Sequence, residues 1–117
     1  MLRVKRVYDT VSNEDGFRIL VDRLWPRGMS KEKANVALWI RDIAPSDGLR
    51  KWFGHDRKKW SEFKEKYYEE LGDKENLISL VVEKMSSGNV TLLFGAKDEK
   101  FNNAVALKEY IAKRRRS

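Results

Sequence analysis

The chain has 117 residues, which leaves room for a single domain but not for two independent cores. It contains no cysteine and one histidine, so disulfides, thiol nucleophiles, thiolate zinc sites and multi-histidine metal sites are excluded. The glycine signatures of nucleotide hydrolases, dinucleotide-binding proteins and serine hydrolases are also missing, and we therefore expect no cofactor and no metal. Because the N-terminus lacks a signal-peptide pattern and no apolar run could span a bilayer, we expect a cytoplasmic protein without membrane contact.

The formal net charge of +7 suggests nucleic acid as one possible partner. However, Lys113 to Arg116 supply four of these seven charges, so much of the excess lies in a basic C-terminal tail, residues 113–117. Such a tail can be a solvated helix end that complements the helix dipole, or it can contact phosphates together with the basic run 57–59. Both interpretations remain open from the sequence.

The first half of the chain contains two expected strands. Residues 2–7 alternate imperfectly and precede a polar loop, residues 9–16. The centre of residues 17–24 is apolar on both faces, as expected for a strand covered on both sides, and Pro26 and Gly28 end it. Ser30 can cap a short helix that reaches about Val36. Residues 38–44 fit either a strand or a helix, and Pro45 ends that segment in either case.

The second half is mainly helical around one strand. Ser46 or Asp47 can cap a turn that carries Leu49, Trp52 and Phe53. Two amphipathic helices are then expected, one from Asp56 to Leu71 and one that begins at Asp73 and ends before Gly88, with apolar stripes formed by Trp60, Phe63, Tyr67 and Leu71, and by Leu77, Leu80, Val81 and Met85. Residues 90–94 form a second strongly apolar strand. Asn102 or Asn103 can cap a final helix that turns Ala104, Leu107 and Ile111 inward.

Two buried strands separated by amphipathic helices predict a small three-layer α/β/α domain with a mainly parallel sheet. Ligands of such sheets bind outside the carboxyl ends of the strands, where the strand order reverses. The two identifiable ends are residues 22–28 and 95–98, and we expect a ligand site where they meet.

The turn after the first buried strand is the strongest candidate for this site. Arg27 follows a Trp25-Pro26 pair that stiffens the chain, and a stiffened guanidinium suits a phosphate or carboxylate. Gly28 would let the backbone approach the ligand closely. Asp22 and Arg23 precede this turn, and the alternative for both is an ion pair within the fold, with Trp25 serving only to cover the core.

Four further residues complete the candidate set. Lys97 and Asp98 follow the second buried strand and could bind an anion or position a nucleophile, although Asp98 could equally accept hydrogen bonds from its own turn. His55 is the natural candidate for proton transfer, or it is only a turn residue before a helix. Trp52 would contribute an aromatic wall.

Four stretches together resemble the YeaO-like family: residues 20–28 (LVDRLWPRG), 44–46 (APS), 49–56 (LRKWFGHD) and 91–98 (TLLFGAKD). The resemblance covers nearly the whole chain and implies a small α/β protein of bacteria or archaea, in a family of unknown function. A longer related branch resembles this chain but carries a Cys-His-Arg-type motif after the last strand, where this sequence has Asn102-Asn103-Ala104. Thiol chemistry would not transfer.

The leading functional hypothesis is a site for an anionic, phosphorylated or nucleotide-like small molecule, with catalysis left undecided. Arg23 and Arg27 would hold the anion with help from Lys97, while Asp98 and His55 would transfer protons or orient the ligand. The alternatives are a nucleic-acid-binding module that uses the basic tail and a protein-interaction domain whose aromatic segment, residues 25–63, provides a partner surface.

Overall fold

The computed structural model describes the backbone of residues 1–116 and the side chains of residues 1–114. Four strands form an all-parallel sheet in the order β1-β4-β2-β3: β1 (Leu2–Arg6), β2 (Phe17–Leu20), β3 (Leu38–Trp39) and β4 (Val90–Phe94). The register pairs Val4 with Leu92 and Ile19 with Leu92, so β4 lies between the first two strands of the chain. The predicted α/β class and the parallel sheet are therefore confirmed.

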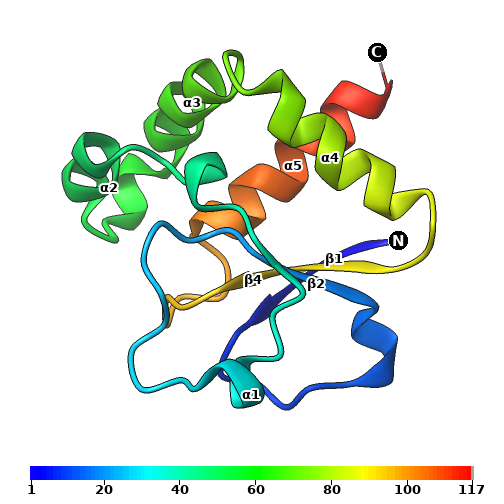
Figure 1. Cartoon of the computed structure of the whole chain (residues 1–117). Helices are drawn as coiled ribbons and strands as arrows, with labels where there is room; N and C mark the ends of the chain where they lie inside the picture. The colour runs from blue at the N-terminus through cyan, green and yellow to red at the C-terminus, as the bar shows by residue number, and fades with distance from the viewer. Residues whose placement is uncertain (117) are drawn as a thin grey trace.

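Helices lie on both faces of this sheet (Figure 1). One face carries α2 (Asp47–Phe53), α3 (Trp60–Leu71), α4 (Glu75–Met85) and α5 (Asn103–Arg116), whereas the other carries only the single turn of α1 (Lys31–Ala34) and the loops around it. Three short 3₁₀ turns, η1 (Asn13–Asp15), η2 (Arg41–Ile43) and η3 (Arg57–Lys59), connect the larger elements.

Side chains alternate between two cores because successive residues of a strand point to opposite faces. Ile19, Val21, Leu92 and Phe94 pack against the four larger helices in the main core. On the opposite face a smaller core joins Leu20 and Leu93 to the side chains of Val7, Ala34, Trp25 and Trp39. Both faces of β2 and β4 are thus covered, as their apolar sequences predicted.

Side-chain caps mark the starts of several of the helical elements. The Ser30 and Ser46 side chains accept backbone N–H groups at the starts of α1 and α2, as predicted. Asp56 caps only the 3₁₀ turn η3, and the helix expected from Asp56 to Leu71 begins instead at Trp60, without a side-chain cap. Asp73 does not cap α4; the helix begins after Lys74, which makes no side-chain cap bond. The ambiguous segment 38–44 divides into the two-residue β3 and the turn η2, because only Leu38 and Trp39 of this segment pair with β2.

The buried stripe of α4 differs from the predicted one. Ile78 and Val81 are buried, whereas Leu77, Leu80 and Met85 are only partly buried at the margin of the main core. The helix is apolar over a wide arc, and packing rather than periodicity selects which residues lie innermost. In α5, by contrast, Ala104, Leu107 and Ile111 are all fully buried, as expected.

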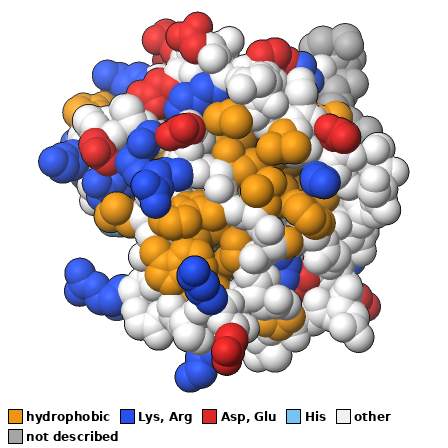
Figure 2. All heavy atoms as spheres, viewed as in Figure 1, with side chains coloured by type: hydrophobic (Ala, Val, Ile, Leu, Met, Phe, Trp, Pro, Cys, Tyr) orange, Lys and Arg blue, Asp and Glu red, His pale blue; other side chains and the backbone are white. Residues whose placement is uncertain are grey.

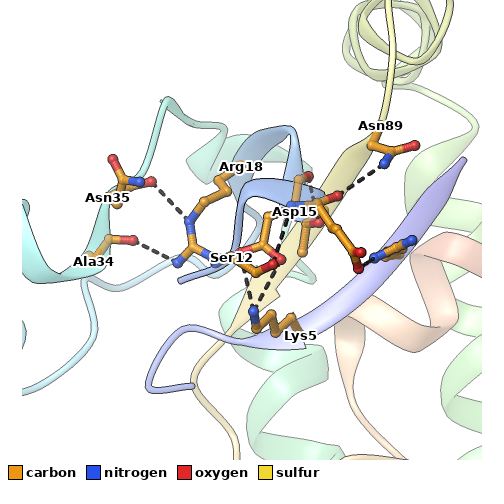
Figure 3. A network of polar contacts seen from close by, with 10 residues as sticks. Lys5, Ser12, Asp15, Arg18, Ala34, Asn35 and Asn89 are labelled. Carbon is orange, nitrogen blue, oxygen red and sulfur yellow. Dashed lines mark hydrogen bonds and ion pairs between the residues drawn. The ribbon is translucent and has the colours of Figure 1, made fainter. Parts of the chain in front are cut away.

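A buried ion network joins the loop before β2 to α1 (Figure 3). Arg18 is 2% exposed, and its Nη1 lies 2.6 Å from the Asp15 carboxylate. The other guanidinium nitrogens donate to the carbonyls of Ala34 (2.8 Å) and Asn35 (3.0 Å). Lys5 contacts both Asp15 oxygens, at 3.1 and 3.2 Å. This network provides hydrogen-bond partners for the polar side chains on the face of the sheet that only α1 and its loops cover.

The C-terminal residues that were predicted as a basic tail continue α5 through Arg116. The Arg114 guanidinium forms an ion pair with Glu75 at the start of α4. The side chains of Arg115 and Arg116, and all of Ser117, lie outside the described part of the chain. Within the described residues no helix combines the length and apolar character needed to cross a membrane.

Candidate functional site

A cleft of about 420 Å³ opens beyond the carboxyl ends of β2 and β4. The chain leaves β2 toward β3 by way of α1, whereas it leaves β4 toward α5, which packs on β1 and β4. Connections that diverge from two adjacent parallel strands leave a crevice between them, and such crevices are the usual ligand sites of parallel sheets. Its walls come from the turns after β2 and β4, from α2 and α3, and from the start of α5: Asp22, Arg23, Leu24, Ala44, Pro45, Arg50, Lys51, Phe53, Gly54, His55, Phe63, Gly95, Ala96, Asn102 and Asn103.

Hydrogen bonds to the Asp22 carboxylate connect the turn after β2 with the end of β4 and the start of α5. One carboxylate oxygen accepts the backbone N–H of Gly95 at 2.8 Å, and the other accepts the Asn103 side-chain amide at 3.0 Å. The same amide nitrogen donates to the carbonyl of Val21 at 3.0 Å. Burial raises the pKa of the Asp22 carboxyl, while the Asn103 and Gly95 hydrogen bonds and the charge of Arg50 oppose this rise. The contact at Gly95 also leaves little space, since a Cβ there would lie 3.2 Å from the Asp22 carboxylate.

Positive side chains gather on the α2 side of the cleft. Arg23 donates to the carbonyls of Pro45 (3.3 Å) and Ala44 (3.4 Å), which hold its guanidinium in place. Arg50 donates to Asp47 at 3.2 Å, and Arg23 lies 3.7 Å from the same carboxylate. Asp47 is thus a shared, exposed counter-ion, and its side chain is 63% exposed. Figure 2 shows Lys and Arg side chains concentrated on the side of the molecule where α2 lies in Figure 1.

The remaining walls are apolar, apart from His55 at the edge. Phe53 and Phe63 stack with ring centroids 4.4 Å apart, and Leu24 is 64% exposed. His55 follows Gly54 in a left-handed turn, with φ angles of 60° and 51°. Its ring lies 6.3 Å from that of Phe53, and it has no hydrogen-bond partner among the described residues. The cleft can therefore contact an apolar or planar group as well as a charged one.

Of the residues predicted from sequence, Asp22, Arg23 and His55 line this cleft. The predicted residues of the Arg27 turn, namely Trp25, Arg27 and Gly28, are not part of its lining. The Arg27 side chain is exposed, and its carbonyl accepts the Tyr8 hydroxyl at 2.8 Å. Trp25 donates its indole N–H to the carbonyl of Met29 at 2.7 Å and packs on Trp39 in the smaller core. Gly28 adopts a positive φ of 78° in this turn. These contacts fix the turn, and ligand binding by Arg27, Gly28 and Trp25 stays a prediction.

The two predicted residues of the turn after β4, Lys97 and Asp98, do not line the cleft either. Lys97 is exposed and lies outside the cleft lining. Asp98 accepts the backbone N–H groups of Lys100 and Phe101, and these bonds, followed by the Arg57 guanidinium at 3.1 Å, hold its pKa below the ordinary value despite an opposing contribution from desolvation. This matches the turn-forming interpretation of Asp98. The structure does not bring Asp98 and His55 together in one cleft.

Trp52, in α2, is not among the residues that line the cleft. The ammonium groups of Lys59 and Lys66 lie over its ring, 5.0 and 4.6 Å from the centroid. The indole is thus part of a basic, aromatic surface that adjoins the main core. Its role as a ligand wall remains a prediction.

Sequence reasoning missed Arg50, Lys51, Asn102 and Asn103 as cleft residues. The first two belong to α2, and only the tertiary position of that helix places them opposite the end of β2. The asparagines were interpreted as helix caps, and Asn102 does accept the Val105 N–H at 2.9 Å. Their place directly after a strand-end turn was the available indication of a second role.

One negative finding concerns metal binding by the described residues. No cluster of three or more histidine, cysteine or acidic side chains in residues 1–114 could hold a metal ion. A second groove, of about 500 Å³, lies between β3 and α4, and its lining residues are Leu38, Trp39, Ile40, Arg41, Asp42, Leu77 and Leu80. Figure 2 shows hydrophobic side chains gathered on this face of the molecule.

Comparison with known proteins identifies the family. All 117 residues match the DUF488-N3i model, described as the inactive DUF488-N3 subclade. The uncharacterised protein YeaO of Escherichia coli is 37% identical over 110 residues, which are 94% of this chain and 96% of that protein. Uncharacterised proteins of Mycobacterium tuberculosis and Mycobacterium bovis are 44% identical over 79 residues, 68% of this chain and 67% of each relative. No solved structure matches the chain at a significant level. The chain belongs to the YeaO-like family, within the subclade described as inactive DUF488-N3.

Proposed function

We propose that this chain is a cytoplasmic binding protein that holds an anionic, phosphate- or carboxylate-bearing small molecule in the cleft beyond β2 and β4. The observation that carries the proposal is the convergence of Arg23, Arg50 and Lys51 on one cleft of about 420 Å³. This volume lies within the range of about 300–1,000 Å³ that is typical of small-molecule sites.

The geometry of these cations favours an anion over internal pairing. Arg23 and Arg50 share one exposed carboxylate, that of Asp47, so their positive charge is only partly compensated. Each guanidinium presents several N–H donors in a plane, which suits the oxygens of a phosphate or carboxylate. Phe53, Phe63 and Pro45 supply apolar contact for the rest of the ligand.

Binding rather than catalysis is the function we favour. The described cleft lining contains no serine, threonine or cysteine that could act as a nucleophile. Among the described residues, His55 has no hydrogen-bond partner that would orient its ring for proton transfer. The description of the family as an inactive subclade points in the same direction.

Two observations make nucleic acid the weaker candidate. Arg114 of the basic C-terminus is paired with Glu75, and Lys59 lies over the Trp52 ring. These cations would have to leave their contacts to reach a phosphate backbone.

The proposal is tested by calorimetric titration of AMP and ribose 5-phosphate, with adenosine and ribose as their uncharged counterparts. We expect the phosphate esters to bind and Arg50→Ala to weaken them about tenfold or more, since a hydrogen bond to a charged group contributes about 1.5–3 kcal/mol. Lys58→Ala is the matched control, because it removes one exposed positive charge from η3, outside the cleft lining. Equal losses in the two variants, or no binding of either phosphate ester, would refute the proposal.

A further inference from the structure

The cleft contains a feature that a simple anion site does not need, namely a carboxylate where β2 and β4 end. Asp22 lines the cleft together with the cations of α2 and Arg23. A phosphate or sulfate ion that filled this space would lie close to a group of its own charge, and like charges in a partly buried site repel strongly.

The Asp22 carboxylate retains capacity for a ligand. Each of its oxygens accepts one hydrogen bond within the protein, from Gly95 and from Asn103. An ionised carboxylate offers about four acceptor positions in total. The remaining positions can accept O–H or N–H groups, but the ionised group has no proton to donate.

The two internal bonds also fix where these positions lie. They join Asp22 to the first residue after β4 and to the start of α5, while the Asn103 amide is held in turn by the Val21 carbonyl at 3.0 Å. A carboxylate held by three structural elements loses little freedom when a ligand binds, and this favours selectivity for the matching donor.

We infer that Asp22 makes the cleft selective for molecules that carry a hydroxyl or amino donor in addition to their anionic group, such as hydroxyl-bearing phosphate esters, and that it discriminates against simple anions. This inference rests on the proposed function. The donor of the ligand lies against Asp22, the anionic group faces Arg23 and Arg50, and the apolar part contacts Phe53 and Phe63.

The first test changes the ligand and leaves the protein unaltered. Ribose 5-phosphate and pentyl phosphate carry the same anionic group on a five-carbon skeleton, but pentyl phosphate has no hydroxyl group on its carbon chain. We expect the wild-type protein to bind ribose 5-phosphate at least tenfold more tightly than either pentyl phosphate or inorganic phosphate. Equal affinity for ribose 5-phosphate and pentyl phosphate would overturn the inference.

The second test changes Asp22. In Asp22→Asn we expect ribose 5-phosphate to bind more weakly and inorganic phosphate more tightly, so that the ratio of their dissociation constants changes at least tenfold. Glu14→Gln is the matched control, because it makes the same exchange of a carboxylate for an amide at an exposed side chain outside the cleft lining, and it should leave this ratio within about threefold of wild type. Circular dichroism checks that both variants are folded.

The outcomes separate the inference from the function on which it rests. If Arg50→Ala weakens both ligands but Asp22→Asn leaves their ratio unchanged, the role of Asp22 is wrong and the anion site stands. If Arg50→Ala affects neither ligand, the anion site itself is wrong. Should Asp22→Asn not fold, the comparison of ribose 5-phosphate with pentyl phosphate in the wild-type protein decides the inference alone.

Discussion

Replacing Asp15 by asparagine should destabilise the protein through its buried partner, Arg18. The side chains of this pair are only 5% and 3% exposed, and Nη1 of the arginine lies 2.6 Å from the carboxylate. Removing one member of a buried ion pair leaves an uncompensated charge and costs about 3–5 kcal/mol. Because the Ala34 and Asn35 carbonyls still accept hydrogen bonds from Arg18, we expect the lower end of this range.

A loss of about 3 kcal/mol is a large part of the roughly 5–15 kcal/mol that stabilises a typical domain. For a chain of this size it should lower Tm by about 10 °C or more. Urea unfolding followed by circular dichroism measures the free energy directly. The matched control is Glu14→Gln, since the Glu14 side chain is 78% exposed and its ion pair with Arg3 spans 3.4 Å. We expect a change within about 0.5 kcal/mol for this control.

The loss of stability in Asp15→Asn should depend on pH, and the pKa of Asp15 determines in which direction. Burial alone would raise the pKa of Asp15, but the Ser12 N–H, Lys5 and Arg18 together hold it below the ordinary value of 3.8. A lowered pKa in the folded state contributes stability above the unfolded-state pKa, and this stability is lost as the pH falls through the folded-state pKa. The difference between wild type and Asp15→Asn should therefore be full at pH 7 and shrink below about pH 4. A difference under 1 kcal/mol at pH 7, or one independent of pH, would refute the reasoning.

Three further substitutions test a buried hydrogen bond and the space around two glycines. Tyr67→Phe removes a buried hydroxyl that donates to the Ile43 carbonyl at 2.7 Å, and urea unfolding at pH 7 should show a loss of about 1–3 kcal/mol. Burial, followed by nearby negative charges, raises the pKa of Tyr67 well above 10, so wild-type stability should fall above about pH 10. The variant should show a shallower fall, and parallel curves would contradict this. Gly16→Ala places a Cβ 2.2 Å from the Asn89 carbonyl oxygen at a positive φ of 65°, whereas Gly28→Ala meets open space at a φ of 78°. Thermal melts should show a much larger fall in Tm for Gly16→Ala than for Gly28→Ala. Similar falls in Tm would mean that the backbone strain at positive φ, and not the contact with Asn89, decides the loss of stability.

The sequence by itself determined β1, β2, β4 and the final helix, but not the short strand β3. The apolar centre of residues 17–24 and the apolar run 90–94 formed parallel strands, because only a two-sided core can cover such segments. Serine caps at positions 30 and 46 and the periodicity of α5 are local signals that depend on neighbouring residues alone. The same reasoning indicated the strand ends, where the structure has a cleft lined by Asp22 and Arg23, while ligand binding there stays a prediction.

Only the tertiary structure decided which other side chains reach that cleft. The Arg27 and Lys97 turns begin beside the cleft but lead away from it, whereas α2, distant in sequence from both strand ends, brings Arg50 and Lys51 to it. The direction of a turn depends on contacts such as that between Tyr8 and the Arg27 carbonyl, which join residues far apart in the chain. Because such contacts are set by packing across the sheet, no local pattern could have predicted them.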